Sequence, residues 1–161
     1  MRSATLDVTV RDAVAADLGF LRDALSRLNE EMRELACATG VRREDFQGLN
    51  IDGCLQRETF LIAVQGEEPR GFLSIYFPCP PSGRPLVPPQ QQATISTACV
   101  VPESRRQGIV SILLAAAEAR CRAWGATGIG LGFIEGNHAA EAAYRKTGFV
   151  ATRRAMWRRF D

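Results

Sequence analysis

The residues whose types and spacing best suit chemistry stand together between Cys99 and Leu114. This stretch reads CVVPESRRQGIVSILL, a β-rich segment that ends at a proline, a short basic turn, and a glycine where a helix begins. The N–H groups in the first turn of a helix, together with the helix dipole, form a site for anions. Gly108 has no Cβ, so the backbone can approach an oxyanion closely, and Arg105 and Arg106 add positive charge. The pattern is typical of a pyrophosphate cradle, and equally of a plain helix start with two surface arginines.

A second group of residues surrounds the helix that we expect after Asn137. Asn137 is a favoured N-cap residue, and Gly148 is a favoured residue just after a helix. Tyr144 lies seven residues after Asn137. A phenol of pKa ~10 can protonate a basic leaving group, or its ring can simply pack against the core.

Metal and disulfide chemistry have little support in the sequence. There is one histidine, His138, and no C-x-x-C pair among the five cysteines, which are Cys37, Cys54, Cys79, Cys99 and Cys121. This pattern predicts neither a zinc site nor a disulfide framework, so we expect no metal. With no recognisable signal peptide, we expect a reducing, cytoplasmic location. A cysteine nucleophile paired with His138 remains an alternative.

Composition limits the class of protein. The 161 residues, 46% hydrophobic and 24% charged, predict one globular domain over 1–161. A net charge of +2 is too balanced to favour nucleic acid as a partner. No apolar run approaches the ~20 residues needed to span a membrane.

The hydrophobic pattern predicts the elements that hold these residues. We expect helices over 18–35, from about 112 to 124, and between 137 and 148, and strands over 8–10, 59–64, 71–77, 93–101, 129–134 and 149–160. The proline-rich stretch 78–92 is expected to be an exposed loop. We interpret the arginine-rich end of the chain as an edge strand protected by charge. The element order predicts a mixed sheet covered by helices, with a parallel crossover between the strands around Ile95 and Leu131.

Two motifs carry a resemblance to a known family. The pattern V-x-P-x-x-R/Q-x-x-G-x-G/A followed by x-x-L-L is matched by Val100, Pro102, Arg105, Gly108, Leu113 and Leu114. The pattern N-x-x-A-x-x-x-Y-x-x-x-G-F is matched by Asn137, Ala140, Tyr144, Gly148 and Phe149. In this order and separation the two motifs resemble the GNAT acetyltransferase superfamily. The resemblance implies an α/β (mixed α+β) fold, in which two adjacent parallel strands of a central mixed sheet splay apart between flanking helices.

The resemblance also implies an activity and a set of contacts. An acetyl group would pass directly from acetyl-CoA, as co-substrate, to a primary amine of a small molecule or peptide. Backbone groups of Ala98 and Val100 would hold the pantetheine arm, and Asn137 would hydrogen-bond to it. The pyrophosphate would bind backbone N–H groups of Arg106, Gln107, Gly108, Ile109, Val110 and Ser111. Tyr144 would be the general acid that protonates the departing thiolate.

Two departures from the family pattern keep a second hypothesis open. Val110 stands where the motif has glycine or alanine, and a β-branched residue restricts the first helical turn. No glutamate occupies the splayed strands, where the corresponding residues are Ser96, Thr97 and Gly132. Glu135 and His138 are substitutes by proximity only, and a water chain would also serve as the base. The alternative is a non-catalytic acyl-CoA-binding sensor or interaction module.

The acceptor itself is not identified by the sequence. Acidic residues of the first helix and the segment after it are the candidates for attracting a cationic amine: Glu30, Glu31, Glu34, Glu44 and Asp45. Homodimer formation is also left open.

Overall fold

The computed structural model describes residues 7–77 and 92–160. Its helices are α1 (Leu18–Ala38), α2 (Ile51–Arg57), α3 (Ile109–Ala123) and α4 (His138–Lys146), and its strands are β1 (Val8–Asp12), β2 (Thr59–Gln65), β3 (Glu68–Tyr76), β4 (Gln92–Val100) and β5 (Gly128–Leu131). Short 3-10 turns cover 15–17, 43–45 and 102–104. The proline-rich stretch predicted at 78–92 lies outside the described residues except for Gln92, which already belongs to β4.

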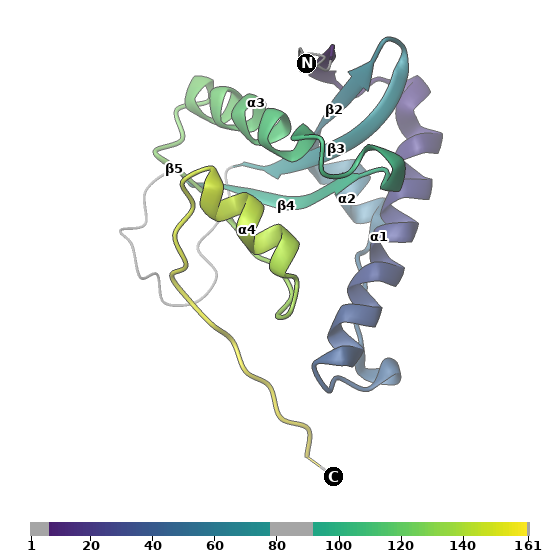
Figure 1. The fold of residues 1–161 in the computed structure, drawn as a ribbon, viewed down its shortest axis with the longest axis vertical. Helices are drawn as coiled ribbons and strands as arrows, with labels where there is room; N and C mark the ends of the chain where they lie inside the picture. The colour runs from purple at the N-terminus through teal and green to yellow at the C-terminus, as the bar shows by residue number, and fades with distance from the viewer. Residues whose placement is uncertain (1–6, 78–91, 161) are drawn as a thin grey trace, which may run out of the picture.

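The strands form one mixed sheet in the order β1-β2-β3-β4-β5 (Figure 1). The first three pairings are antiparallel, whereas β4 and β5 run parallel, with Ile95 opposite Leu131. The connection between these two strands is α3, as expected for a parallel crossover. The predicted mixed sheet with flanking helices is therefore confirmed.

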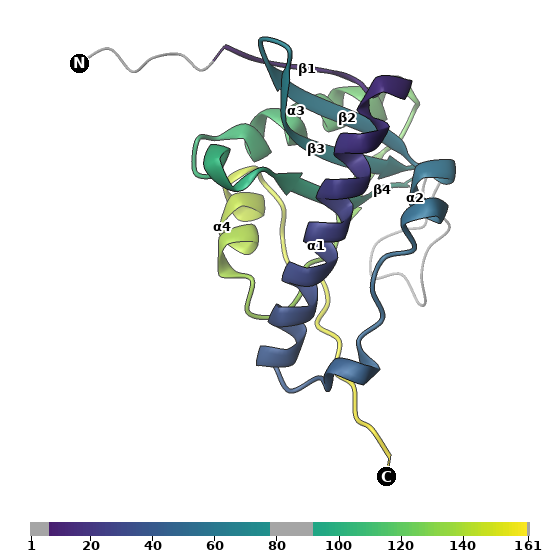
Figure 2. The same cartoon turned by 90° about the vertical axis from the view of Figure 1, so that its right-hand side faces the viewer.

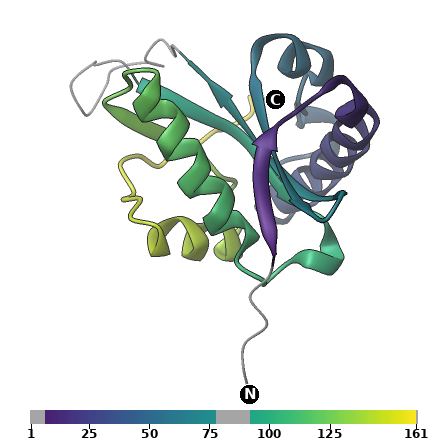
Figure 3. The ribbon, with the colours of Figure 1, turned by 90° about the horizontal axis from the view of Figure 1, so that it is seen from above.

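Hydrophobic side chains cover both faces of the sheet. On one face α3 packs against the strands, with Leu113 and Ala117 fully buried, and Tyr144 of α4 packs at the margin of this cluster. On the other face α1 contributes Leu21 and Leu25 to a second cluster, which α2 also joins. Figure 3 shows the sheet between α3 and α4 on one side and α1 and α2 on the other.

A bulge in β4 separates the last two strands. Ile95 pairs with Ile75 of β3 and Thr97 pairs with Ser74, so Ser96 is an extra residue without a partner in β3. The pairing of β4 with β5 ends at Ile95, although β4 continues to Val100. Bulges bend a strand and end its pairing. We call the side of β4 from Ser96 to Val100 that faces away from β3 the open edge.

The segment before β2 contains a helix that the hydrophobic pattern did not predict. The Asn50 side chain accepts a hydrogen bond from the Gly53 N–H at 3.0 Å and so caps α2. Asn29 of α1 accepts from the Leu49 N–H at 2.7 Å and holds the segment that leads into it. A helix of seven residues is too short to show a clear period.

The predicted strand over 149–160 is wrong. Residues 150–160 are extended but exposed, and they belong to no strand of the sheet. Arg154 pairs with Glu135, and Arg159 pairs with Asp45 at 2.7 Å, so charged side chains attach this segment to the rest of the chain. Figures 1 and 2 show it leading away from the sheet. The strand predicted over 129–134 is also shorter and ends at Leu131.

Candidate functional site

Main-chain groups of β4 line the open edge. The Val101 N–H donates to the Arg70 carbonyl of β3 at 2.9 Å. Because main-chain groups alternate in direction along a strand, those of Ala98 and Val100 face away from β3, toward the open edge. The structure therefore directs both predicted pantetheine contacts to the same edge.

The turn after β4 exposes the start of α3. Arg106 has φ +65° and Gly108 has φ +82°, and no atom lies within 4 Å of a Cβ placed on Gly108. The Ile112 N–H bonds to the Gly108 carbonyl at 3.2 Å. The three N–H groups before it, of Ile109, Val110 and Ser111, therefore precede the helical hydrogen bonding of α3. Open space above helix N–H groups is what an anion such as a pyrophosphate requires.

Arg105 does not direct its charge into this turn. Its Nε donates to the Val100 carbonyl at 3.1 Å, and its Nη2 donates to Glu31 Oε1 of α1 at 2.6 Å. The sequence interpretation, in which Arg105 adds charge for an anion, does not hold for this arrangement. Arg106 and Gln107 are exposed at the same turn.

Val110 packs against the core on the α3 side of the sheet. Ile109 beside it is 2% exposed. Both residues therefore offer their backbone N–H groups at the helix start while their side chains join the core. This packing favours the interpretation in which the Val110 side chain does not narrow the pyrophosphate cradle, the turn from Arg106 to Ser111.

Asn137 caps α4 as the sequence predicts. Its Oδ1 accepts from the Ala140 N–H at 3.2 Å. The side-chain oxygen is therefore engaged, and its NH2 group is the part that could donate to a pantetheine carbonyl or hydroxyl. Gly148, with φ +94°, follows the end of the same helix.

Tyr144 lies between two aromatic rings. Its ring centroid is 6.0 Å from that of Phe133 and 6.1 Å from that of Phe149. Burial raises the pKa of Tyr144 above its ordinary value. The phenol is therefore held in its protonated form, which a proton donor needs and which packing against the core also produces.

Among residues 7–77 and 92–160, none of the positions considered for the base carries an unpaired carboxylate. Thr97 is buried, and its hydroxyl lies 2.6 Å from that of Ser74 in a shared hydrogen bond. Ser96 is exposed at the bulge. Glu135 is exposed and paired with Arg154, and His138 is exposed at the first residue of α4.

Cysteine chemistry finds no support at this site. Cys99 is 7% exposed, and burial raises the pKa of its thiol. A thiol held protonated is a poor nucleophile. The charged side chains that influence the Cys99 thiol are Glu31, Arg27 and Arg105.

Most of the acidic residues expected to attract a cationic acceptor are paired with arginines. Their pairs are Glu30 with Arg33, Glu31 with Arg105, Glu34 with Arg43, and Asp45 with Arg159. These partners neutralise much of the negative charge beside α1. The charge argument for a strongly cationic acceptor is weakened accordingly.

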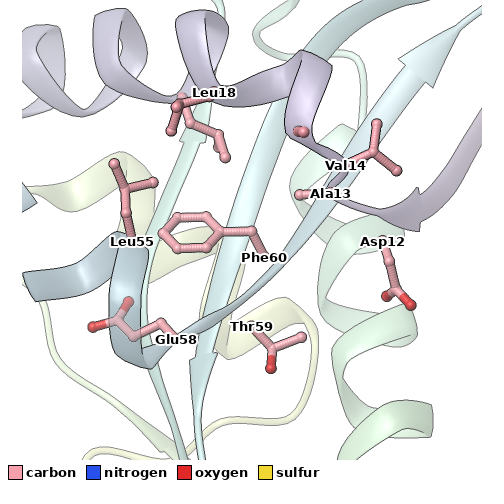
Figure 4. A pocket seen from close by; sticks show the side chains of 10 residues that line it. Asp12, Ala13, Val14, Leu18, Leu55, Glu58, Thr59 and Phe60 are labelled. Atoms are coloured by element: carbon pink, nitrogen blue, oxygen red, sulfur yellow. The ribbon is translucent and has the colours of Figure 1, made fainter. Parts of the chain in front are cut away.

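A pocket of about 440 Å³ lies away from the open edge. Figure 4 shows the apolar side chains of Val14, Leu18, Leu55 and Phe60, with the carboxylates of Asp12 and Glu58 near them. It adjoins the start of β2, and Thr59 of β2 lies opposite Ile75, which lies opposite Ile95. The pocket therefore lies at the end of the sheet where β4 begins, whereas the turn from Arg106 to Ser111 follows the end of β4.

Within residues 7–77 and 92–160, no group of three or more His, Cys, Asp or Glu side chains is arranged to hold a metal ion. No helix in the same ranges is long and apolar enough to cross a membrane.

Two adjacent parallel strands that part, followed by a helix with an exposed N-terminus, are the arrangement that the motif resemblance implied. The sequence profile of the Acetyltransferase (GNAT) family matches residues 23–149. The chain belongs to this family. No curated protein matches the chain by sequence.

Solved structures share the fold at low sequence identity. The tetramutant of the BH1408 protein from Bacillus halodurans has a TM-score of 0.72 and 20% identity, covering 94% of this chain and 99% of that chain. The aminoglycoside N-acetyltransferase AAC(6')-Iy in complex with CoA has a TM-score of 0.70 and 15% identity, covering 95% and 99%. A transcriptional regulator from Bacillus halodurans has a TM-score of 0.66 and 24% identity, covering 95% and 99%. The different functions named for these structures leave the acceptor open.

Proposed function

We propose that the protein is an N-acetyltransferase that moves an acetyl group directly from acetyl-CoA to a primary amine of a small molecule or peptide. The observation that carries this proposal is the continuity of the open edge of β4 with the exposed start of α3. The open edge provides main-chain groups for the amide-containing pantetheine arm, and the start of α3 provides N–H groups for a pyrophosphate. The CoA complex named for AAC(6')-Iy supports the same class of ligand.

The residues of this chain would bind acetyl-CoA along that edge. Main-chain groups of Ala98 and Val100 and the NH2 of Asn137 would hold the pantetheine arm. The backbone N–H groups of the cradle would hold the pyrophosphate; the cradle comprises Arg106, Gln107, Gly108, Ile109, Val110 and Ser111. The open space above Gly108 is consistent with this use. When bound, acetyl-CoA supplies a thioester, whose carbonyl carbon accepts the amine.

Tyr144 would donate the proton that the departing thiolate needs. A phenol, whose ordinary pKa is ~10, is protonated at neutral pH, as a proton donor must be. The amine must lose a proton during the same reaction, and no carboxylate is clearly placed to take it. We assign that step to water reaching the exposed bulge at Ser96.

A panel of amines, including peptides and aminoglycosides, tests this proposal, with release of free thiol as the readout. We expect amine-dependent thiol release by the wild-type protein. Mass spectrometry of the acceptor should show the added acetyl group.

The second candidate is a non-catalytic acyl-CoA-binding sensor. The lack of a clearly placed base favours it, as does the pairing of Glu135 with Arg154. Tight binding of acetyl-CoA by calorimetry, with no thiol release above the rate without amine, would support the sensor over the enzyme.

Self-association and a cytoplasmic location belong to the same proposal. Large apolar side chains between 150 and 160 are exposed: Val150, Met156, Trp157 and Phe160. Large exposed apolar side chains within one short segment favour self-association, which supports a homodimer. Sedimentation equilibrium of the wild-type protein tests this, and Trp157→Glu should shift it toward monomer.

A further inference from the structure

One arginine joins the loop before α3 to two other segments. Arg105 bonds through Nε to the carbonyl of Val100, the last residue of β4, and through Nη2 to Glu31 of α1. Val100 lies only five residues before Arg105, whereas Glu31 of α1 lies 74 residues away in the sequence. We call this group, Glu31, Val100 and Arg105, the Arg105 clasp.

The clasp lies at the far end of the open edge. The Val100 carbonyl faces this edge, since the next residue bonds to β3. Arg105 therefore engages a main-chain acceptor that a neighbouring strand would otherwise meet. The N–H of Val100 and the main-chain groups of Ala98 remain on the same edge for a ligand.

The residue next to the clasp has an uncommon backbone conformation. Arg106 is the one non-glycine residue with positive φ in the described part of the chain, at +65°. This region is unfavourable for a residue with a Cβ. Such a conformation persists only where the surrounding structure holds it. The clasp holds the loop on one side of Arg106, and α3 holds it on the other.

We propose that Arg105 and Glu31 are positioning residues that keep the cradle in its anion-binding shape, so that coenzyme A affinity depends on an ion pair with α1. This inference rests on the proposed function. It assigns Arg105 a role that differs from direct contact with phosphate. The ion pair also connects the loop before α3 to α1, the helix that lies across the sheet in Figure 2.

A different role for Glu31 predicts a change in coenzyme A affinity in the opposite direction. If Glu31 instead withheld Arg105 from the phosphates, loss of the Glu31 charge would free the guanidinium and tighten coenzyme A binding. If the clasp positions the loop, the same change weakens binding. One variant therefore separates the two roles.

The expected effect is moderate because both side chains are partly exposed, 41% for Arg105 and 39% for Glu31. Ion pairs at such positions contribute little by themselves, but the clasp also includes a charged hydrogen bond to a main-chain carbonyl. We expect Glu31→Gln and Arg105→Gln each to raise the Kd for coenzyme A by about threefold to tenfold.

The experiment is calorimetric titration of coenzyme A into wild type, Glu31→Gln, Arg105→Gln and the double variant. Asp52→Asn is the matched control, because Asp52 forms an exposed 2.8 Å pair between α2 and Arg22 of α1. The control should bind like wild type. The double variant should bind no more weakly than the weaker single variant, since each change breaks the same clasp.

Kinetics and conservative variants distinguish positioning from general loss of structure. With an active acceptor, Glu31→Gln should raise KM for acetyl-CoA and leave kcat unchanged. Glu31→Asp, which keeps the charge, should restore part of the affinity. Thermal melting should give each folded variant a Tm close to that of Asp52→Asn.

Unchanged or tighter binding in Glu31→Gln would overturn the clasp proposal, and so would additive losses in the double variant. If Glu31→Gln does not fold, Glu31→Ala removes the same charge and provides the same comparison. A wild-type protein that fails to bind coenzyme A would refute the proposed function itself, whereas normal wild-type binding with unaffected variants refutes the clasp alone.

Discussion

Replacement of Gly108 tests whether the turn before α3 binds coenzyme A, because the effect on binding can be compared with the loss of stability from backbone strain. Gly108 has φ +82°, and a Cβ added there meets no atom within 4 Å. Gly108→Ala therefore introduces no clash inside the protein, and its cost in stability comes from backbone strain of about 1–2 kcal/mol. For a domain of this size, that cost lowers Tm by roughly 2–8 °C.

Coenzyme A should respond much more strongly than stability. The open space above Gly108 is where the proposed pyrophosphate approaches the backbone. A methyl group there keeps phosphate oxygens out of hydrogen-bond distance, and the carboxylate of Gly108→Glu adds repulsion. We expect Gly108→Ala to weaken coenzyme A binding by at least about tenfold, and Gly108→Glu to abolish detectable binding.

Gly66 provides the matched control. It has φ +63°, and no atom lies within 4 Å of its added Cβ, but it lies in the turn between β2 and β3. Gly66→Ala should lower Tm by a similar amount and leave coenzyme A binding unchanged. Calorimetry and thermal melting on the same samples give both quantities. Wild-type affinity in a folded Gly108→Glu variant would refute the cradle.

Three further predictions concern Tyr144, Val110 and Asp17. Tyr144→Phe should keep coenzyme A affinity and lower kcat on the order of 10²-fold, whereas Glu135→Gln should change kcat much less; wild-type kcat in Tyr144→Phe contradicts the acid role. Val110→Ala should not tighten coenzyme A binding measured by calorimetry, because Val110 already packs against the core; a clear gain in affinity would show that it narrows the cradle. Hydrogen bonds from Arg11 hold the pKa of Asp17 below its ordinary value, so this carboxylate stabilises the fold above pH ~4 and loses that effect as pH falls through its lower folded pKa. Asp17→Asn should therefore lower the free energy of unfolding by about 1–3 kcal/mol at pH 7 and flatten its loss in acid during urea titrations, and an unchanged acid profile would contradict this assignment.

The sequence predicted the parts of the fold that local patterns specify. The cap at Asn137 and the glycine after α4 depend on spacing within one or two turns, and the structure confirms them. The parallel crossover follows from the order strand, helix, strand, and the structure confirms it too. The motif also indicated which residues begin α3. The cap, the glycine and the start of α3 arise from contacts between residues close in sequence.

Other features depend on partners distant in sequence. The pairing of Arg105 with Glu31 joins a loop to a helix more than seventy positions away in the sequence, and nothing in the motif indicates it. The arginine-rich end was predicted to be a strand because its apolar residues alternate with charged ones. Alternation also suits an exposed extended segment, and whether it pairs depends on an adjacent strand edge.

The bulge at Ser96 was similarly hidden. A bulge is defined by the register of two strands, and no residue type between Thr94 and Thr97 marks it. The motif therefore did not show that, of the positions corresponding to the base, Thr97 is buried against Ser74 while Ser96 is exposed.

Titration of the isotope-labelled wild-type protein with coenzyme A, followed by amide chemical shifts, tests most directly whether coenzyme A binds along the open edge and at the start of α3. If coenzyme A binds there, the largest shifts occur at Ile109, Val110 and Ser111 and along the open edge at Ala98 and Val100. Absence of shifts at saturating coenzyme A, or shifts confined to the pocket around Phe60, would contradict binding at this site.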